Sequence, residues 1–353
     1  MVAPFLPSLA CGRGPVLSLT KEKGEGVSRR FLLISLLISF LWNGDFSFAA
    51  DKLRIGYSGA TITNSMLWVT HEGRLFEKNG IDAEVLYLQT TLGQTAMIVG
   101  EIQMCVYSAS LLTPARLQGA DVVMLLSFLH KPIYRLVVRP EIRTIADLRG
   151  KRIGITRFGT VSDWTTRLLL SRLGLDAEKD VTLIQSGDVP VLVNGLAVGK
   201  TIDAAIMQPP YDKKLAASGL RVLLNMQEMD IVLQQTGLNT TQKFIARSPD
   251  IVRRAVKSVI DGIHFMRNHP AVAKRAISKH MQIKDERDLE DSYQLLRSFI
   301  QPKPYPNLEG FKLIFEEAAK RLPAAKTANA KDFVDTRFIE ELDKTGYIDG
   351  LYR

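Results

Sequence analysis

The feature that most restricts the fold of this chain is the alternation of short strand-like runs with helical segments between residues 53 and 226. The expected strands are residues 53–57, 82–88, 103–107, 122–128, 134–138, 152–156, 181–185, 203–207 and 221–225. Helical segments connect them, and several end at a glycine, which is a common helix stop. This order predicts an α/β protein whose mostly parallel sheets are covered by helices on both faces.

The last third of the chain has a different character. Helical segments follow Asn239 with hardly a strand among them, at residues 249–265, 271–279, 286–299, 308–320 and 331–343. Helices that have no sheet of their own must bury their apolar faces elsewhere. We therefore expect this C-terminal part to pack back on the sheet built by the first strands.

The composition is that of a globular protein. Of the 353 residues, 46% are hydrophobic and 24% are charged, which excludes a disordered tail, a collagen-like fibre and a polytopic membrane protein. The formal net charge is +9, but the basic residues do not cluster with aromatic residues, so nucleic-acid binding is not expected. A chain of this length is expected to form two compact units.

Residues 1–49 are expected to be a signal peptide. Arg29 and Arg30 precede an apolar run at residues 31–42, and small residues occupy Ser47 and Ala49, the two positions that a signal peptidase reads. The apolar run is shorter than the roughly 20 residues that a membrane span needs. We therefore expect a periplasmic protein, either released by cleavage after Ala49 or held by the retained signal as an anchor.

Other features of this leader leave its route and its start open. The arginine pair resembles a twin-arginine signal, but the residue usual before Phe31 is missing, so ordinary secretion is favoured. Cys11 does not follow the basic and apolar segments that precede a lipid-anchor cysteine. Translation from Val27 would give a leader of more usual length.

Five blocks of residues follow one another along the chain, as LRIGY at 53–57, EGRLFEKNGI at 72–81, VGEIQ at 99–103, IADLRGKRIG at 145–154 and LAVGKTIDAA at 196–205. In this order they resemble the nitrate/sulfonate/taurine family of periplasmic solute-binding proteins for ABC importers. Each block alone is weakly specific. Their shared order over nearly the whole chain carries the resemblance.

The resemblance implies a two-lobed periplasmic binding protein of type II, with two chain crossings and a helical C-terminal return. Lobe 1 would comprise residues 51–132 plus 236–353, and lobe 2 residues 133–235. The lobes would close on a small organic or inorganic anion about hinges near 130–135 and 230–238. The expected partners are this ligand, an ABC permease and its ATPase, and the chain is expected to be a monomer without cofactor or metal.

Ligands of open α/β sheets bind at the carboxyl ends of the strands, and this rule selects the candidate site. The selected residues are Ser58, Gly59, Thr61, Thr63, Gln89, Thr90, Ser108 and Ser110 in lobe 1, with Arg157, Gly159, Thr160, Ser162, Trp164, Asp188 and Gln208 in lobe 2. Hydroxyls and N–H groups at helix starts favour an anion, and Arg157 would supply the opposite charge.

Structural roles compete with binding at several of these positions. Thr63 and Ser162 could cap their helices, Trp164 could be a packing residue rather than a lid, and Arg157 could pair with Asp163 on the surface. Gln208 stands where a carboxylate is common in the family, which weakens the case for an amine ligand. The ligand itself is not determined by these positions.

Enzymatic activity is not expected. The same superfamily includes thiamine-pyrimidine precursor synthases with a cysteine-rich iron motif, but after the leader the chain has only Cys105. No histidine has a partner at metal-ligand spacing, and no nucleophilic triad is apparent. A protein that binds a pyrimidine or another thiamine precursor, or a sensory module that presents its ligand to a receptor, remains an alternative.

Overall fold

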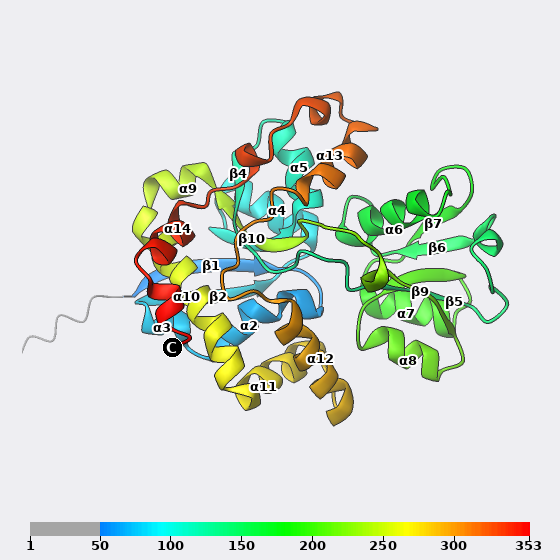
Figure 1. Cartoon of the computed structure of the whole chain (residues 1–353), viewed down its shortest axis with the longest axis horizontal. Helices are drawn as coiled ribbons and strands as arrows, with labels where there is room; N and C mark the ends of the chain where they lie inside the picture. Colours follow the sequence, from blue (N-terminus) through cyan, green and yellow to red (C-terminus); the bar gives the residue numbers. More distant parts are fainter. Residues whose placement is uncertain (1–49) are drawn as a thin grey trace, which may run out of the picture. The chain divides into compact units, whose positions relative to one another are not determined.

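The computed structural model describes residues 50–353, so the predicted signal peptide lies outside the described residues. These residues contain two five-stranded sheets with helices around each (Figure 1). The α/β class with a helical C-terminal return is confirmed. No helix in this part of the chain combines the length and apolar character needed to cross a bilayer.

The first sheet has the order β2-β1-β3-β10-β4. Its strands are β1 (Asp51–Tyr57), β2 (Ile81–Tyr87), β3 (Met104–Ser108), β4 (Val122–Ser127) and β10 (Thr236–Thr241). β1 runs parallel to β2 and β3, whereas β10 is antiparallel to both β3 and β4. β10 is a fully buried strand that the sequence analysis did not predict, and it brings the chain back into the first sheet.

The second sheet has the order β7-β6-β8-β5-β9. Its strands are β5 (Arg135–Val138), β6 (Arg152–Ile155), β7 (Thr182–Gln185), β8 (Ala204–Met207) and β9 (Arg221–Asn225). β6 is parallel to β7 and β8, and β5 is antiparallel to β8 and β9. The helical elements around this sheet are η2 (Ala146–Leu148), α6 (Val161–Arg172), α7 (Val189–Ala197), α8 (Tyr211–Ala217) and η3 (Met226–Glu228).

The remaining helices belong with the first sheet and cover both of its faces (Figure 1). Those before the second sheet are η1 (Ile62–Asn64), α2 (Ser65–Glu72), α3 (Leu75–Lys78), α4 (Thr90–Val99) and α5 (Ala109–Leu117). Those after it are α9 (Gln242–Arg247), α10 (Pro249–Asn268), α11 (Pro270–Met281), α12 (Glu286–Phe299), α13 (Phe311–Ala319), η4 (Pro323–Thr327), η5 (Ala330–Phe333), α14 (Arg337–Lys344) and α15 (Tyr347–Gly350). We call the first sheet with these helices the first half, and the second sheet with its helices the second half.

Each face of the first sheet has its own apolar core. On one face Trp68 of α2 and Val259 of α10 pack with Leu53 of β1, and on the other Phe311 of α13 packs with Met124 of β4. The C-terminal helices therefore contribute to both cores of the first half. This packing explains why they need no sheet of their own.

Two chain segments connect the halves, and they run side by side. The N–H of Leu233 donates to the carbonyl oxygen of His130 at 2.8 Å, and that of Gln235 to Leu129 at 3.0 Å. His130 also contacts the carbonyl oxygen of Tyr305 through Nε2 at 3.0 Å. A carbonyl can only accept, so His130 is the donor and its Nε2 carries the proton.

We expect the partly buried position of His130 to make the free energy of unfolding depend on pH. Burial lowers the pKa of His130 in the folded protein. Below about pH 6.5 the imidazole is therefore protonated in the unfolded chain but still largely neutral in the folded protein. Stability should therefore fall as the pH drops from 7.0 to 5.5. The slope should be smaller in His130→Gln, whose amide can still donate to Tyr305. Equal slopes in thermal melts of the two proteins would contradict this.

Candidate functional site

A cavity of about 110 Å³ lies between the carboxyl ends of strands from both sheets. In the first half, the ends of β1, β2 and β3 contribute to its wall, and in the second half the ends of β6 and β8 and the loop after β7. The loops that follow these strands lead into helices, as in other open α/β sheets that bind ligands. The two halves therefore present their loops to one common space.

Most of the residues selected from the sequence line this cavity. They are Ser58, Gly59, Thr61, Thr63, Gln89, Ser108, Arg157, Thr160, Ser162, Asp188 and Gln208. Ser110, Gly159 and Trp164 are not among the lining residues, and the side chain of Thr90, at the start of α4, lies outside what the structure describes.

Ser110, Gly159 and Trp164 make other contacts. Ser110 is buried and its hydroxyl lies 2.8 Å from that of Ser108. Gly159 donates its N–H to Asp163. Trp164 packs against apolar clusters of both halves. It therefore acts as a packing residue and does not cover the cavity as a lid.

In the first half, the loop after β1 is held by Asn64. Its Nδ2 donates to the carbonyl oxygens of Ser58 at 2.5 Å and Gly59 at 3.0 Å, and to Thr61 Oγ1 at 3.1 Å. The Thr63 hydroxyl lies 3.0 Å from that of Thr61, and neither caps a helix through its side chain. Asn64 was not selected from the sequence, although an asparagine just before a helix is a common loop-fixing residue.

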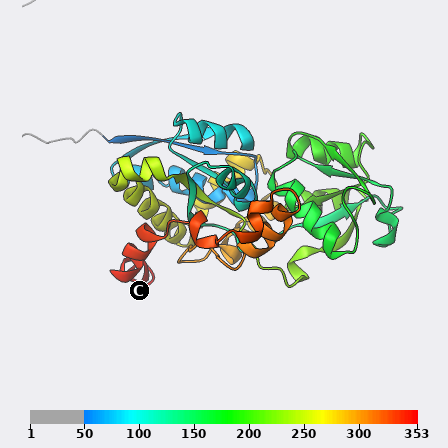
Figure 2. The same ribbon diagram turned by 90° about the horizontal axis from the view of Figure 1, so that it is seen from above.

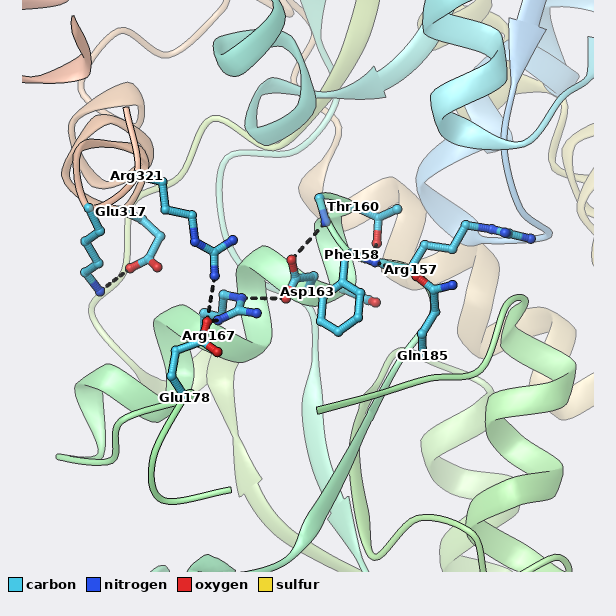
Figure 3. A network of polar contacts seen from close by, with 12 residues as sticks. Arg157, Phe158, Thr160, Asp163, Arg167, Glu178, Gln185, Glu317 and Arg321 are labelled. Atoms are coloured by element: carbon cyan, nitrogen blue, oxygen red, sulfur yellow. Dashed lines mark hydrogen bonds and ion pairs between the residues drawn. The ribbon is translucent and has the colours of Figure 1, made fainter. Parts of the chain in front are cut away.

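In the second half, side chains occupy three N–H groups of the loop that joins β6 to α6. Figure 3 shows Phe158, Gln185 and Asp163 of these contacts. The backbone N–H of Thr156 donates to Ser162 Oγ at 2.7 Å, that of Phe158 to Gln185 Oε1 at 3.1 Å, and that of Gly159 to Asp163 Oδ2 at 2.9 Å. These three N–H groups are therefore not free for an anion, in contrast to the expectation from the sequence. Ser162 holds the loop instead of capping α6.

Arg157 is the cation that this loop presents to the cavity. It does not pair with Asp163, whose Oδ1 accepts from Arg167 at 2.6 Å, and it makes no ion pair with any carboxylate of residues 50–353. Figure 3 shows its side chain pointing away from Asp163. The guanidinium is therefore available to a ligand.

A carboxylate and a phenol share the cavity with Arg157. Burial raises the pKa of Tyr87, the negative charge of Asp188 raises it further, and the positive charge of Arg157 lowers it. The three side chains therefore act on one another at the cavity wall. The site contains charges of both signs, which was not evident from the sequence.

The cavity also has an aromatic and amide wall that sequence reasoning missed in part. Tyr107 and Tyr134 are only 3% and 5% exposed, and burial raises their pKa values, so both phenols remain neutral at physiological pH. The side chain of Gln208 is also buried, and within residues 50–353 its Oε1 has no hydrogen-bond partner. Tyr107 lies one residue before Ser108 and Tyr87 two residues before Gln89, so a strand-end rule that included the last residues of the strands would have selected both.

The single cysteine of the described residues is part of the core and not of the site. Cys105 is 2% exposed, and burial raises the pKa of its thiol to about 12. A thiol in this state is a poor nucleophile. Within residues 50–353, no three His, Cys, Asp or Glu side chains are arranged to hold a metal ion.

Comparison with known families identifies the chain's relatives. The model of the NMT1/THI5-like family matches residues 65–273, more than half of the chain. The chain belongs to the NMT1/THI5-like family. A relative from Brucella abortus is 24% identical over 268 residues, which is 74% of this chain and 81% of the relative. Its name mentions binding but specifies no ligand.

Solved structures with similar coordinates show the fold of the chain, which is the periplasmic binding protein fold. A protein from Bordetella bronchiseptica matches with a TM-score of 0.73 and 16% identity, covering 83% of this chain and 97% of that one. The periplasmic aliphatic sulphonate binding protein of Escherichia coli matches with a TM-score of 0.61 and 18% identity, covering 81% and 92%. The periplasmic binding protein fold and the resemblance drawn from the sequence blocks are thereby confirmed.

Proposed function

We propose that this protein is the extracytoplasmic solute-binding component of an ABC importer, and that it captures a small organic anion in the cavity between its halves. The observation that carries this proposal is Arg157, a cation at the cavity wall without an ion-pair partner in residues 50–353. The bound ligand would be delivered to a membrane permease that works with an ATPase. No catalytic residue is assigned.

A sulfonate is the anion class that we favour. The similar structure from E. coli binds aliphatic sulphonates, and the sulfonate oxygens can accept hydrogen bonds from a guanidinium and from hydroxyls. Thr61 and Ser108 supply such hydroxyls around the cavity. Apolar and aromatic residues in the same wall would contact the organic part of the ligand.

A neutral nitrogen heterocycle such as a pyrimidine is the second candidate. Gln208 Oε1 has no partner among the described residues, and Asp188 offers a further acceptor, so the cavity could bind N–H groups as well as an anion. Tyrosine side chains in the wall would stack on a planar ring. The match to the NMT1/THI5-like family is compatible with this alternative.

Binding would proceed by closure of one half on the other. We propose the predicted lobe boundaries, residues 51–132 plus 236–353 and 133–235, as the two moving bodies, with the connecting segments as hinges. The ligand would contact both halves only in the closed form and would thereby stabilise it.

A thermal-shift screen of the purified protein tests this proposal. The compounds are ethanesulfonate, taurine, nitrate, short carboxylates and aminopyrimidines. A ligand at 100 times its Kd adds about 2.7 kcal/mol of stability, which is a measurable shift in Tm. Shifts by organic anions support the sulfonate class, and shifts confined to aminopyrimidines support the second candidate. If no compound of either class binds, both assignments of the ligand are wrong.

A further inference from the structure

The loop that carries Arg157 is the first part of a series of charged contacts. Asp163 is 2% exposed, and its two oxygens accept from the N–H of Gly159 at 2.9 Å and from Arg167 Nε at 2.6 Å. Arg167 is itself only 7% exposed. Each of these buried charges needs its partner, because an unpaired charge in the interior is strongly unfavourable.

The series continues into the other half of the molecule. Arg167 donates a second hydrogen bond to Glu178 Oε1 at 2.6 Å, and the same oxygen accepts from Arg321 at 2.8 Å (Figure 3). Arg321 follows α13, whose Phe311 and Phe315 are part of a core of the first half. Figure 2 shows the orange segment after α13 beside the green second half.

We propose that Arg321 and Glu178 act as positioning residues, which fix the Arg157 loop through Arg167 and Asp163 when the two halves are together. The inference rests on the proposed function, because it gives Arg157 the role of binding the ligand. The proposal adds that the Arg321–Glu178 contact between the halves influences the conformation of the loop that carries Arg157. Closure of the halves would then increase the affinity for the ligand, and ligand binding would favour closure, in addition to the effect of direct contacts between the ligand and both halves.

The charges of the series are suited to this role. Glu178 accepts from two guanidinium groups, and Arg167 followed by Arg321 lowers the pKa of its carboxyl, so it stays ionised. The side chains of Arg321 and Glu178 are 58% and 66% exposed. A pair in this environment is weakened by salt, whereas the buried pair of Asp163 and Arg167 is not.

Backbone amide exchange tests the proposal without any ligand. Arg321→Glu places a negative charge against Glu178, and we expect the amides of Phe158 and Gly159 to exchange at least about fivefold faster. Lys320→Glu is the charge-matched control, because Lys320 pairs with Glu317 of its own helix. Lys213→Glu is the second control, because it breaks an ion pair with Asp291 that joins the halves elsewhere. Neither control should change exchange in this loop.

A double variant shows whether Arg321 acts through Glu178. In Glu178→Gln the repulsion is absent, so adding Arg321→Glu should not accelerate exchange beyond the level of Arg321→Glu alone. The difference between Arg321→Glu and Lys320→Glu should also shrink in about 1 M salt. Equal exchange in those two variants, or additive effects in the double variant, would overturn the proposal.

Calorimetry with ethanesulfonate separates this inference from the proposed function. If wild-type protein binds this probe, Arg321→Glu should raise its Kd about fivefold, mainly through faster dissociation. If wild-type protein does not bind it, the sulfonate assignment fails. The exchange measurements still decide the role of Arg321 in that case.

Discussion

Replacing Gly237 by alanine is expected to destabilise the protein by about 3 kcal/mol, the upper part of the range for overpacked cores. Gly237 lies in β10, beside a register shift where β4 accommodates one extra residue. A Cβ at this position would lie within 3.0 Å of the carbonyl oxygen of Leu126 and of the Met124 side chain. Backbone of the neighbouring strand cannot move away without breaking the ladder.

The measurement is the thermal unfolding midpoint of the Gly237→Ala variant. A loss of this size corresponds to about 5–10 °C for a chain of several hundred residues. Gly350→Ala is the matched control, since an added Cβ there meets nothing within 4 Å. We expect the control to melt within about 1 °C of the wild type. If the midpoint of Gly237→Ala also lies within about 1 °C of the wild-type midpoint, the close approach of β10 and β4 is not essential for stability.

The sequence predicted the two series of strands because their apolar runs are short and are bounded by turn residues. It did not predict β10, whose sequence TGLNTT has little apolar character. Its burial is made possible by specific partners, such as the Asn239 amide, which donates to the carbonyl oxygens of Cys105, Tyr107 and Gly237. Contacts with residues more than 100 positions away cannot be inferred from a local pattern.

The strand-end rule located the cavity but did not determine what each residue does there. It selected Gly159 and Trp164, although the N–H of one is used by Asp163 and the ring of the other packs in the core. It did not anticipate Asn64 or Gln185, whose amides fix the two loops. These roles depend on which polar groups the folded chain leaves unpaired, and only the three-dimensional contacts give that information.

Arg157→Ala is expected to weaken the binding of an organic anion by about 10- to 100-fold, the loss of one or two charge-assisted hydrogen bonds. Because Arg157 makes no ion pair within residues 50–353, the thermal midpoint should hardly change. Arg157→Lys keeps the charge but loses the planar fork, so we expect an intermediate Kd. Isothermal titration with the best anion from the screen measures these differences.

The control for this prediction removes a positive charge from the same half without touching the cavity. Arg172 at the end of α6 is exposed, and Arg172→Ala should bind the anion as the wild type does. If both alanine variants bind equally well, the ligand does not use the guanidinium. That result would favour the neutral heterocycle. In that case Gln208→Ala should weaken binding, because Gln208 Oε1 is a buried acceptor without a partner among the described residues and would accept from an N–H group of the ring.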